Sequence, residues 1–255
     1  MANDKLILVT NDDGVDAPGV KKLTEIAQKF GKVLVVCPDG PRSGQSHAVT
    51  VNVPLRKKLI LSEENIQIYS SNGTPVDCVK LALHNLLDVK PDLILSGINH
   101  GANASVNVFY SGTMAAALEG CMLNIPSLGF STFEENYSYN LDIISSDIEK
   151  VIQRVIDNGL PHRTCLNVNF PYNYDPTKGL KVCRMGDAFW KEEFEERFDS
   201  HNTPYYWLKG TFTPIEEGEG TDIWAIKNGY APIVPIMPDI TAHHSIDELT
   251  QIFKI

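Results

Sequence analysis

Long apolar runs are missing from this chain of 255 residues. No stretch approaches the roughly 18 apolar residues that a membrane span requires, which excludes a transmembrane protein. Low-complexity tracts and long runs of one charge are also missing. The first ten residues, MANDKLILVT, have a short apolar run and no basic segment before it. A secretory signal needs both features, so we expect a cytoplasmic protein without a membrane partner.

Cysteine is scarce and scattered. The chain has five cysteines, and they form neither a CxxC pair nor a Cys/His cluster at zinc-binding spacing. This pattern excludes a disulfide framework and a zinc finger. Most of these residues lie in apolar runs, so we expect reduced cysteines that pack in the core. They are Cys37, Cys78, Cys121, Cys165 and Cys183.

Basic residues are outnumbered, with a formal net charge of -10 at pH 7. Binding to a nucleic acid duplex depends largely on Lys and Arg, so this partner is not expected. A phosphorylated small molecule remains compatible with the charge, because exposed charges are screened beyond about 8 Å whereas a bound cation acts at contact distance. The chain has no GxGxxG and no GxxxxGK[ST] motif, which argues against a dinucleotide site or a P-loop.

Strand and helix patterns alternate through the first two-thirds of the chain, as in an α/β protein. The run KLILVT at Lys5–Thr10 is continuously apolar, which is typical of a strand buried on both faces. We therefore predict a Rossmann-like three-layer fold with a mostly parallel sheet. The other predicted strands are 32–37, 48–53, 66–70, 92–96 and 127–131, and the predicted helices are 16–30, 74–90, 111–123, 141–158 and 246–253. We expect Asp16 to cap the first of these helices, and Thr74 and Asp77 to form a capping box at the start of the second.

The periodicity weakens after about residue 185, where Trp, Tyr, Pro and Gly become frequent. We interpret residues 1–255 as a single domain, with an α/β core at about 1–185. Residues 186–255 are then expected to form short strands and an extended C-terminal arm rather than a second domain.

Polar residues follow three of the predicted strands, in the segments NDDG (11–14), PDGPRSGQS (38–46) and SGINHGAN (96–103). The carboxyl ends of parallel strands form the ligand edge of such a sheet. Two adjacent acids repel each other unless a cation separates them, and oxygen donors from Asp, Ser and Asn suit Mg²⁺ or Mn²⁺. The type of ligand alone does not exclude Ca²⁺. Each segment taken singly is also consistent with an ordinary turn.

Ser111, Gly112 and Thr113 precede an Ala-rich helix. Free backbone N–H groups and the helix dipole at such a start can bind a phosphate. A simple Ser N-cap explains the same residues equally well, and the sequence does not separate the two interpretations.

The motifs together resemble the SurE family of survival-protein nucleotidases. They are NDDGVDAPGV, PDGPRSGQSHAVT, NGTPVDCVKLAL, SGINHGAN, YSGTMAAALEG, LNVNFP and GTDIWAIKNGY, which occur in family order from about residue 6 to 231. The resemblance implies one divalent cation per subunit, bound by Asp12, Asp13, Ser43 and Asn99. It also implies phosphate contacts from Asn103, Ser111, Gly112 and Thr113.

The same resemblance implies hydrolysis of nucleoside 5′-monophosphates and 3′-monophosphates, with polyphosphate as a further substrate in some members. It also implies a homodimer or homotetramer that exchanges C-terminal segments, and PDITAHHS at 238–245 is similar to the segment involved. The stretch IVPI at 233–236 departs from the more usual Thr-Pro-Leu, which affects the expected assembly and not the site.

We expect the cation to polarise the phosphoryl group and to present a water, while Asp12 or Asp13 accepts a proton. A non-catalytic nucleotide sensor using the same pocket is the main alternative. A phosphatase with an aspartyl-phosphate intermediate is disfavoured because it usually shows DxDxT, and a purely structural protein leaves the acids unexplained. Phe109, Tyr110 and Trp190 either stack on a base or pack in the fold.

Overall fold

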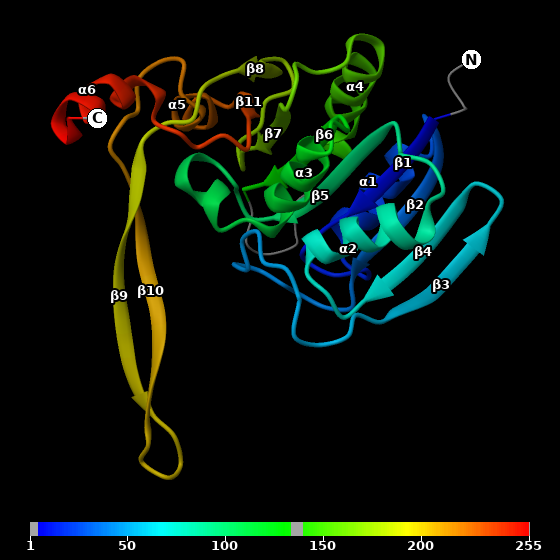
Figure 1. The fold of residues 1–255 in the computed structure, drawn as a ribbon, viewed down its shortest axis with the longest axis horizontal. Coiled ribbons are helices and arrows are strands. Elements are labelled where there is room, and N and C mark those ends of the chain that lie inside the picture. The colour runs from blue at the N-terminus through cyan, green and yellow to red at the C-terminus, as the bar shows by residue number, and fades with distance from the viewer. Residues whose placement is uncertain (1–4, 134–139, 255) are drawn as a thin grey trace.

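A nine-stranded sheet forms the centre of the structure, a computed structural model that describes residues 5–133 and 140–254 (Figure 1). The strands from β4 to β7 run parallel, whereas β3 and β11 are antiparallel to β4 and β7. The predicted α/β class with a mostly parallel sheet is therefore confirmed. In order across the sheet, the strands are β3 (Lys57–Glu63), β4 (Ile66–Ser71), β2 (Gly31–Pro38), β1 (Lys5–Thr10), β5 (Leu93–His100), β6 (Ser127–Thr132), β7 (Cys165–Phe170), β11 (Ala231–Ile236) and β8 (Leu180–Val182).

Helices cover both faces of this sheet (Figure 1). They are α1 (Pro18–Ala27), α2 (Pro75–Leu81), α3 (Gly112–Met122), α4 (Asp142–Asn158), α5 (Asp222–Lys227) and α6 (Ile246–Phe253), with shorter helical turns η1 (Ala82–Leu86), η2 (Ser105–Phe109) and η3 (His243–Ser245). Ile7 and Val9 of β1 pack with α1 and α4, whereas Leu8 packs with α2 and α3 on the other face. Successive strand side chains point to opposite faces, so an unbroken apolar run is what a three-layer core requires.

The order of strands changes direction at β1. The chain passes from β1 to β2 on one side, and after β4 it returns through α2 to β5 on the other side. Loops that leave β1 and β5 therefore diverge, which opens a crevice at the carboxyl ends of these strands. The three polar segments identified in the sequence lie at these strand ends: NDDG follows β1, PDGPRSGQS begins at the last residue of β2, and SGINHGAN covers the end of β5 and the residues after it.

Residues 48–53 do not form the predicted strand, and β3 at Lys57–Glu63 was not predicted. Thr50 donates its backbone N–H to Asp77 Oδ1 at 3.0 Å, and Ala48 accepts from the Thr74 hydroxyl at 2.7 Å. These backbone groups are thus satisfied by the first turn of α2 instead of a neighbouring strand. Residues 48–53, in which apolar and polar side chains alternate, therefore belong to a loop at residues 39–56 that lies across the start of α2.

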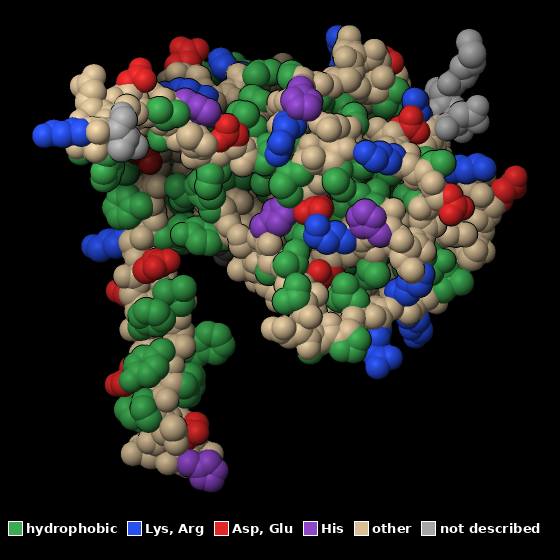
Figure 2. Space-filling view, viewed as in Figure 1, with side chains coloured by type: hydrophobic (Ala, Val, Ile, Leu, Met, Phe, Trp, Pro, Cys, Tyr) green, Lys and Arg blue, Asp and Glu red, His purple; other side chains and the backbone are tan. Residues whose placement is uncertain are grey.

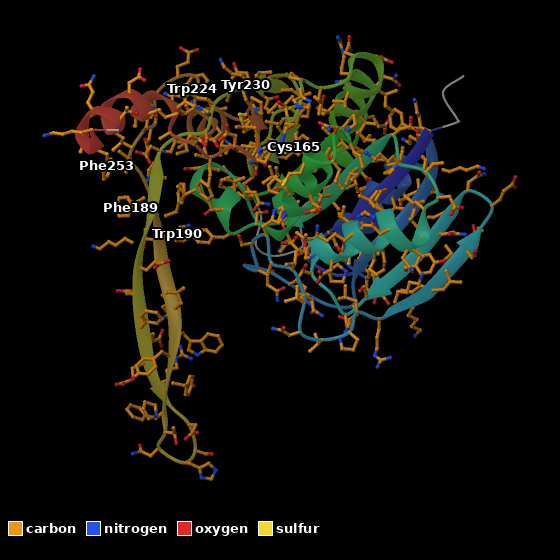
Figure 3. All side chains as sticks on the ribbon, in the orientation of Figure 1. Cys165, Phe189, Trp190, Trp224, Tyr230 and Phe253 are labelled. Carbon is orange, nitrogen blue, oxygen red and sulfur yellow. The ribbon has the colours of Figure 1, made fainter. Side chains whose placement is uncertain are left out.

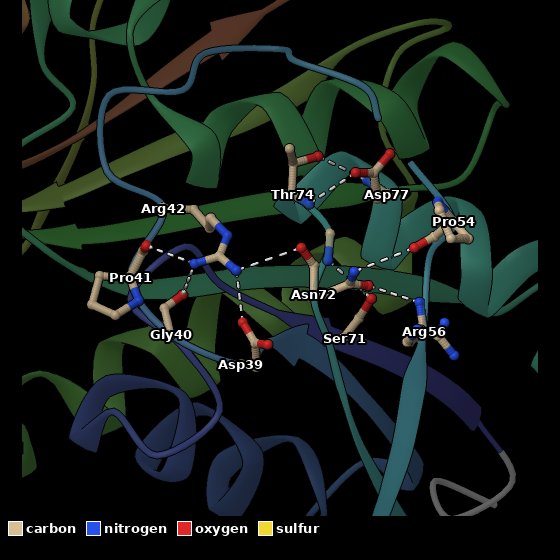
Figure 4. Close-up of polar contacts among 11 residues, drawn as sticks. Asp39, Gly40, Pro41, Arg42, Pro54, Arg56, Ser71, Asn72, Thr74 and Asp77 are labelled. Atoms are coloured by element: carbon tan, nitrogen blue, oxygen red, sulfur yellow. Dashed lines mark hydrogen bonds and ion pairs between the residues drawn. The ribbon is translucent and has the colours of Figure 1, made fainter. Parts of the chain in front are cut away.

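The helix starts follow the sequence with one exception. Thr74 and Asp77 form the predicted capping box at α2, with the Asp77 N–H donating to Thr74 Oγ1 at 3.1 Å and the Thr74 N–H donating to Asp77 Oδ2 at 2.9 Å (Figure 4). At α1 the expected cap by Asp16 is wrong, because Ala17 is the N-cap residue and no side chain caps the helix. Pro18 at the first position fixes that helix start instead.

The region after residue 185 contains longer strands than the sequence predicted. Strands β9 (Ala188–Phe198) and β10 (Pro204–Pro214) have eleven residues each and pair along their whole length. They form a hairpin that extends away from the sheet and carries many exposed hydrophobic side chains (Figures 1 and 2). Helix α6 has the predicted bounds, and none of its residues is buried.

All five cysteines are buried and free, which confirms their predicted role as packing residues. Among the described residues, no helix is long and apolar enough to span a membrane.

A buried acid fastens loop 39–56 to the helices. Glu119 of α3 is only 5% exposed, and its carboxylate accepts hydrogen bonds from His47 Nε2 at 3.1 Å and from Lys80 Nζ at 2.5 Å. His47 belongs to the loop and Lys80 to α2, so three segments meet at this carboxylate. These contacts hold the pKa of Glu119 below its usual value, with the His47 hydrogen bond as the main cause.

Replacement Glu119→Gln should lower the free energy of unfolding at pH 7 by about 1 to 2 kcal/mol, because two charge-assisted hydrogen bonds weaken. The folded-state pKa of Glu119 lies below its unfolded value of 4.5, so its contribution is complete above that value and is lost as the pH falls through the folded pKa. The difference between wild type and variant should therefore shrink between pH 6 and pH 3 in urea unfolding followed by circular dichroism. Glu64→Gln, at an exposed position, is the control. A constant difference across this pH range would contradict the prediction.

Candidate active site

A cavity of about 800 Å³ opens at the crevice between the carboxyl ends of β1 and β5. Three segments that are distant in the sequence contribute its polar wall, and the hairpin contributes an apolar one. Five of the predicted site residues line it, namely Asp12, Ser43, Asn99, Asn103 and Ser111. Its size is in the range of pockets that bind small molecules.

Asp12 lies at the end of β1 and is 4% exposed. Its Oδ1 accepts a hydrogen bond from Thr113 Oγ1 at 2.6 Å. Gly112 allows this approach, because a Cβ there would lie 2.9 Å from Asp12 Cβ and 3.0 Å from Asp12 Oδ2. Burial raises the pKa of Asp12 to about 6, the Thr113 hydrogen bond opposes this rise, and the charge of Asp13 adds to it.

Asp13 is half-buried, and its Oδ2 accepts the His100 backbone N–H at 3.1 Å. Burial raises the pKa of this carboxyl as well, against that hydrogen bond and the nearby His100 side chain. Asp13 lines a separate small hollow of about 40 Å³ beside Gly19 and Thr132. Asp12 and Asp13 are consecutive residues at the end of β1. Two negative charges this close together are unfavourable unless a cation binds near them.

The loop that precedes Ser43 is folded around the Arg42 side chain (Figure 4). The Arg42 backbone N–H donates to the Asp12 carbonyl at 2.7 Å, and its guanidinium pairs with Asp39 at 2.6 Å and contacts the Asn72 carbonyl at 3.5 Å. The neighbouring Ser43 is exposed on the cavity wall. The arginine thus joins the loops after β1, β2 and β4 and brings a hydroxyl to the polar wall.

Asn99 reaches the cavity because β5 is irregular at its end. Its pairing with β6 shifts between Ser96 and Asn99, and Gly97 adopts a φ of +123°, where a Cβ would lie 2.3 Å from the Phe130 carbonyl oxygen. Such a bulge redirects the following side chain. The Asn99 amide nitrogen donates to the Gly101 carbonyl at 2.6 Å, which leaves the side-chain oxygen as the group available to a cation.

Asn103 is held by two residues that the sequence analysis did not single out. Its backbone N–H donates to Asn169 Oδ1 at 2.8 Å, and its carbonyl accepts from Asn167 Nδ2 at 2.8 Å. Its own amide nitrogen donates to Ser131 Oγ at 2.8 Å. The sequence LNVNFP contains a signal for this contact, because two asparagines on one face of a buried strand require polar partners.

The start of α3 completes the polar wall. Ser111 is the N-cap, and its hydroxyl accepts the Met114 backbone N–H at 3.0 Å. The N–H groups of Gly112 and Thr113 precede the first intrahelical hydrogen bond, so they remain as donors for an anion. The N-cap and the anion site are therefore compatible, but the Thr113 side chain is fully buried and is directed to Asp12.

The hairpin and η2 provide the apolar wall, which includes Tyr110, Trp190, Leu208 and Phe212. Phe109, the third aromatic residue considered from the sequence, is not among the residues that line the cavity. Asp222 of α5 fixes this wall, because Asp222 accepts the backbone N–H groups of Ser105 and Gly186, both at 2.8 Å. Asp222 is fully buried, and this burial raises its pKa against those hydrogen bonds.

The donor set of the polar wall suits a hard divalent cation. A carboxylate, a hydroxyl and an amide oxygen come from Asp12, Ser43 and Asn99, and the Asp13 carboxylate lies next to them at the end of β1 without lining this cavity. Oxygen ligands of this kind favour Mg²⁺ or Mn²⁺. Over residues 5–133 and 140–254, no group of three or more His, Cys, Asp and Glu residues is arranged to hold a metal ion. A zinc-type centre built from these side chains therefore has no support in that part of the chain.

Known proteins resemble this chain over most of its length. A family model described as "Survival protein SurE" matches residues 7–192. A protein of Flavobacterium psychrophilum named 5′-nucleotidase SurE is 47% identical over 247 residues, which cover 96% of each chain. A protein of the same name from Bacteroides thetaiotaomicron is 46% identical over 96% of this chain and 94% of its own.

The structural comparison agrees with these matches. The crystal structure of the SurE protein from Aquifex aeolicus has a TM-score of 0.82 and 35% sequence identity to this chain, and it covers 97% of this chain and 99% of its own. The likeness therefore extends over almost the whole chain. This chain belongs to the SurE family.

Proposed function

We propose that this protein is a 5′-nucleotidase that hydrolyses nucleoside 5′-monophosphates, and 3′-monophosphates as well, to nucleoside and phosphate. The observation that carries the proposal is the position of the buried Asp12 beside a helix start, on a cavity large enough for a nucleotide, with the half-buried Asp13 next to it in the chain. The relatives named 5′-nucleotidase SurE support the same reaction. A phosphate monoester hydrolyses extremely slowly in water, so the site must stabilise the developing charge strongly.

One divalent cation, Mg²⁺ or Mn²⁺, is proposed to bind to Asp12, Asp13, Ser43 and Asn99. When bound, it supplies charge that polarises the phosphoryl oxygens and lowers the pKa of a bound water. The raised pKa values of both acids support this assignment, because a nearby cation offsets the cost of burying two like charges.

The protein's own groups are proposed to hold the phosphate and to move a proton. Asn103, the Ser111 hydroxyl and the backbone N–H groups of Gly112 and Thr113 bind and orient the phosphoryl oxygens. Asp12 or Asp13 accepts the proton of the attacking water, and their geometry leaves both acids as candidates. The Thr113 hydroxyl acts through Asp12, since it donates to that carboxylate.

Replacement Asp13→Asn should lower kcat for 5′-AMP with Mn²⁺ by at least about a hundredfold, because both a cation ligand and a negative charge are lost. EDTA should abolish wild-type activity, and added Mn²⁺ should restore it. Phosphate release measures the rate, and circular dichroism checks the fold. Asp16→Asn, at an exposed position outside the cavity, is the matched control. Full turnover by Asp13→Asn would eliminate the proposed cation site, and no phosphate release by wild type with any divalent ion would favour a non-catalytic nucleotide sensor.

Replacement Thr113→Val removes one hydroxyl at nearly constant volume. We expect kcat to fall about tenfold, the effect of one charge-assisted hydrogen bond, while the inhibition constant for inorganic phosphate stays within about threefold. The backbone N–H of residue 113 is retained in this variant, so phosphate binding should persist. An unchanged kcat with much weaker phosphate inhibition would show that the hydroxyl contacts phosphate instead of Asp12.

We further propose that residues 1–255 form a single SurE-like domain that assembles as a homodimer or homotetramer through its C-terminal arm. Helix α6 supports this proposal, because Ile246, Leu249, Ile252 and Phe253 form an exposed apolar stripe at helical spacing. A nucleic acid duplex is not expected as a partner. The cytoplasmic location expected from the N-terminal sequence stays a prediction.

Replacement Ile252→Asp should shift the protein towards monomer, because burial of one isoleucine contributes roughly 1.5 to 3 kcal/mol to an interface. Gln251→Asp introduces a carboxylate on the polar face of the same helix and is the control. Sedimentation equilibrium across a range of concentrations measures the mass. Equal masses for wild type and Ile252→Asp at all concentrations would rule out α6 as part of the interface.

A further inference from the structure

We propose that Trp190 is the residue that recognises the base of the substrate, by stacking on it in the cavity. This inference rests on the proposed nucleotidase function and names the group that distinguishes a nucleotide from other phosphate monoesters. A cavity of about 800 Å³ has room for a nucleoside as well as a phosphate, and its apolar wall is supplied by the hairpin.

The position of Trp190 in the hairpin directs its ring to the cavity. Trp190 is paired with Phe212 across the two strands, so both side chains lie on the same face. Both line the cavity, together with Leu208 of the same face. The preceding Phe189 lies on the opposite side of the hairpin (Figure 3). Alternation along β9 thus assigns Trp190, and not its neighbour, to the cavity.

The ring of Trp190 is fixed in place before any ligand binds. Its indole N–H donates to Asn107 Oδ1 at 2.8 Å, and its ring meets Phe212 edge to face at 5.7 Å between centroids. Gly210 leaves room for the ring, since a Cβ there would lie 3.0 Å from Trp190 Cε3. The residue is nevertheless 37% exposed. A preorganised ring with an accessible surface loses little freedom when a flat ligand stacks on it.

Asn107 connects this ring to the phosphate end of the site. It lies in η2, between the loop that carries Asn99 and Asn103 and the helix start at Ser111. Its amide nitrogen contacts the Ala102 carbonyl at 3.4 Å, while its oxygen holds Trp190. The aromatic wall is therefore tied to the polar wall through one side chain. Stacking does not depend strongly on which base is present, because every base has a π face. This arrangement therefore fits a range of nucleoside monophosphates.

The test compares two substrates that differ only in the base, 5′-AMP and ribose 5-phosphate, with Mn²⁺ present. Replacement Trp190→Ala should lower kcat/KM for 5′-AMP about tenfold, because the base loses the ring on which it stacks. Its kcat/KM for ribose 5-phosphate should stay within about twofold of wild type. Trp190→Phe keeps a ring at this position and should retain most of the preference for 5′-AMP. Phe189→Ala, on the other face of the hairpin, should change neither value.

An equal fall with both substrates would assign Trp190 a purely structural role in packing the hairpin on η2, and unchanged values for both would also overturn the proposal. Tryptophan fluorescence provides a readout that does not depend on turnover. Addition of 5′-AMP should quench the wild-type emission more than ribose 5-phosphate does, and this difference should be lost in Trp190→Phe. The same difference in wild type and Trp190→Phe would count against stacking. Quenching without any phosphate release would retain the base site while rejecting the hydrolase.

Discussion

The electrostatic cost of a buried carboxylate at the end of β1 governs the arrangement around it. Asp12 is 4% exposed and has a second acid as its neighbour, so its charged form needs nearby donors or a cation. Thr113 supplies one donor at 2.6 Å, and this contact is reached only because Gly112 leaves space at the start of α3. The helix start is therefore fixed against the end of β1, where its free N–H groups are available to an anion.

Contacts over long sequence distances give the cavity its other walls. Arg42 joins the loops after three strands, the asparagines of β7 hold Asn103, and Asp222 links η2 to the segment that leads into the hairpin. The contacts of Asn103 and Asp222 satisfy buried backbone groups that would otherwise be costly. A rigid frame of this kind suits phosphoryl transfer, in which positioning and charge stabilisation supply most of the catalysis.

Local signals predicted the parts of the fold in which one pattern dominates. The apolar run at Lys5–Thr10, the capping box at Thr74 and the final helix at Ile246–Phe253 all have their predicted form. The strand predicted at 48–53 is wrong because the backbone groups of these residues form hydrogen bonds with the first turn of α2. Alternation of side chains along the sequence does not reveal this partner. The length of β9 and β10 was underestimated, since their exposed aromatic and charged residues lack the regular alternation of a half-buried strand.

The amino-acid sequence alone determined which donors stand at the strand ends and where α2, α3 and α6 start, because strand and helix periodicity and capping act over a few neighbouring residues. Tertiary structure decided that the Thr113 hydroxyl is directed to Asp12, that Asn107 holds the ring of Trp190, and that Asp222 fixes η2. The three contacts join residues that are 101, 83 and 117 positions apart in the sequence. Their contacts depend on how the sheet and hairpin bring distant segments together, which no local pattern encodes.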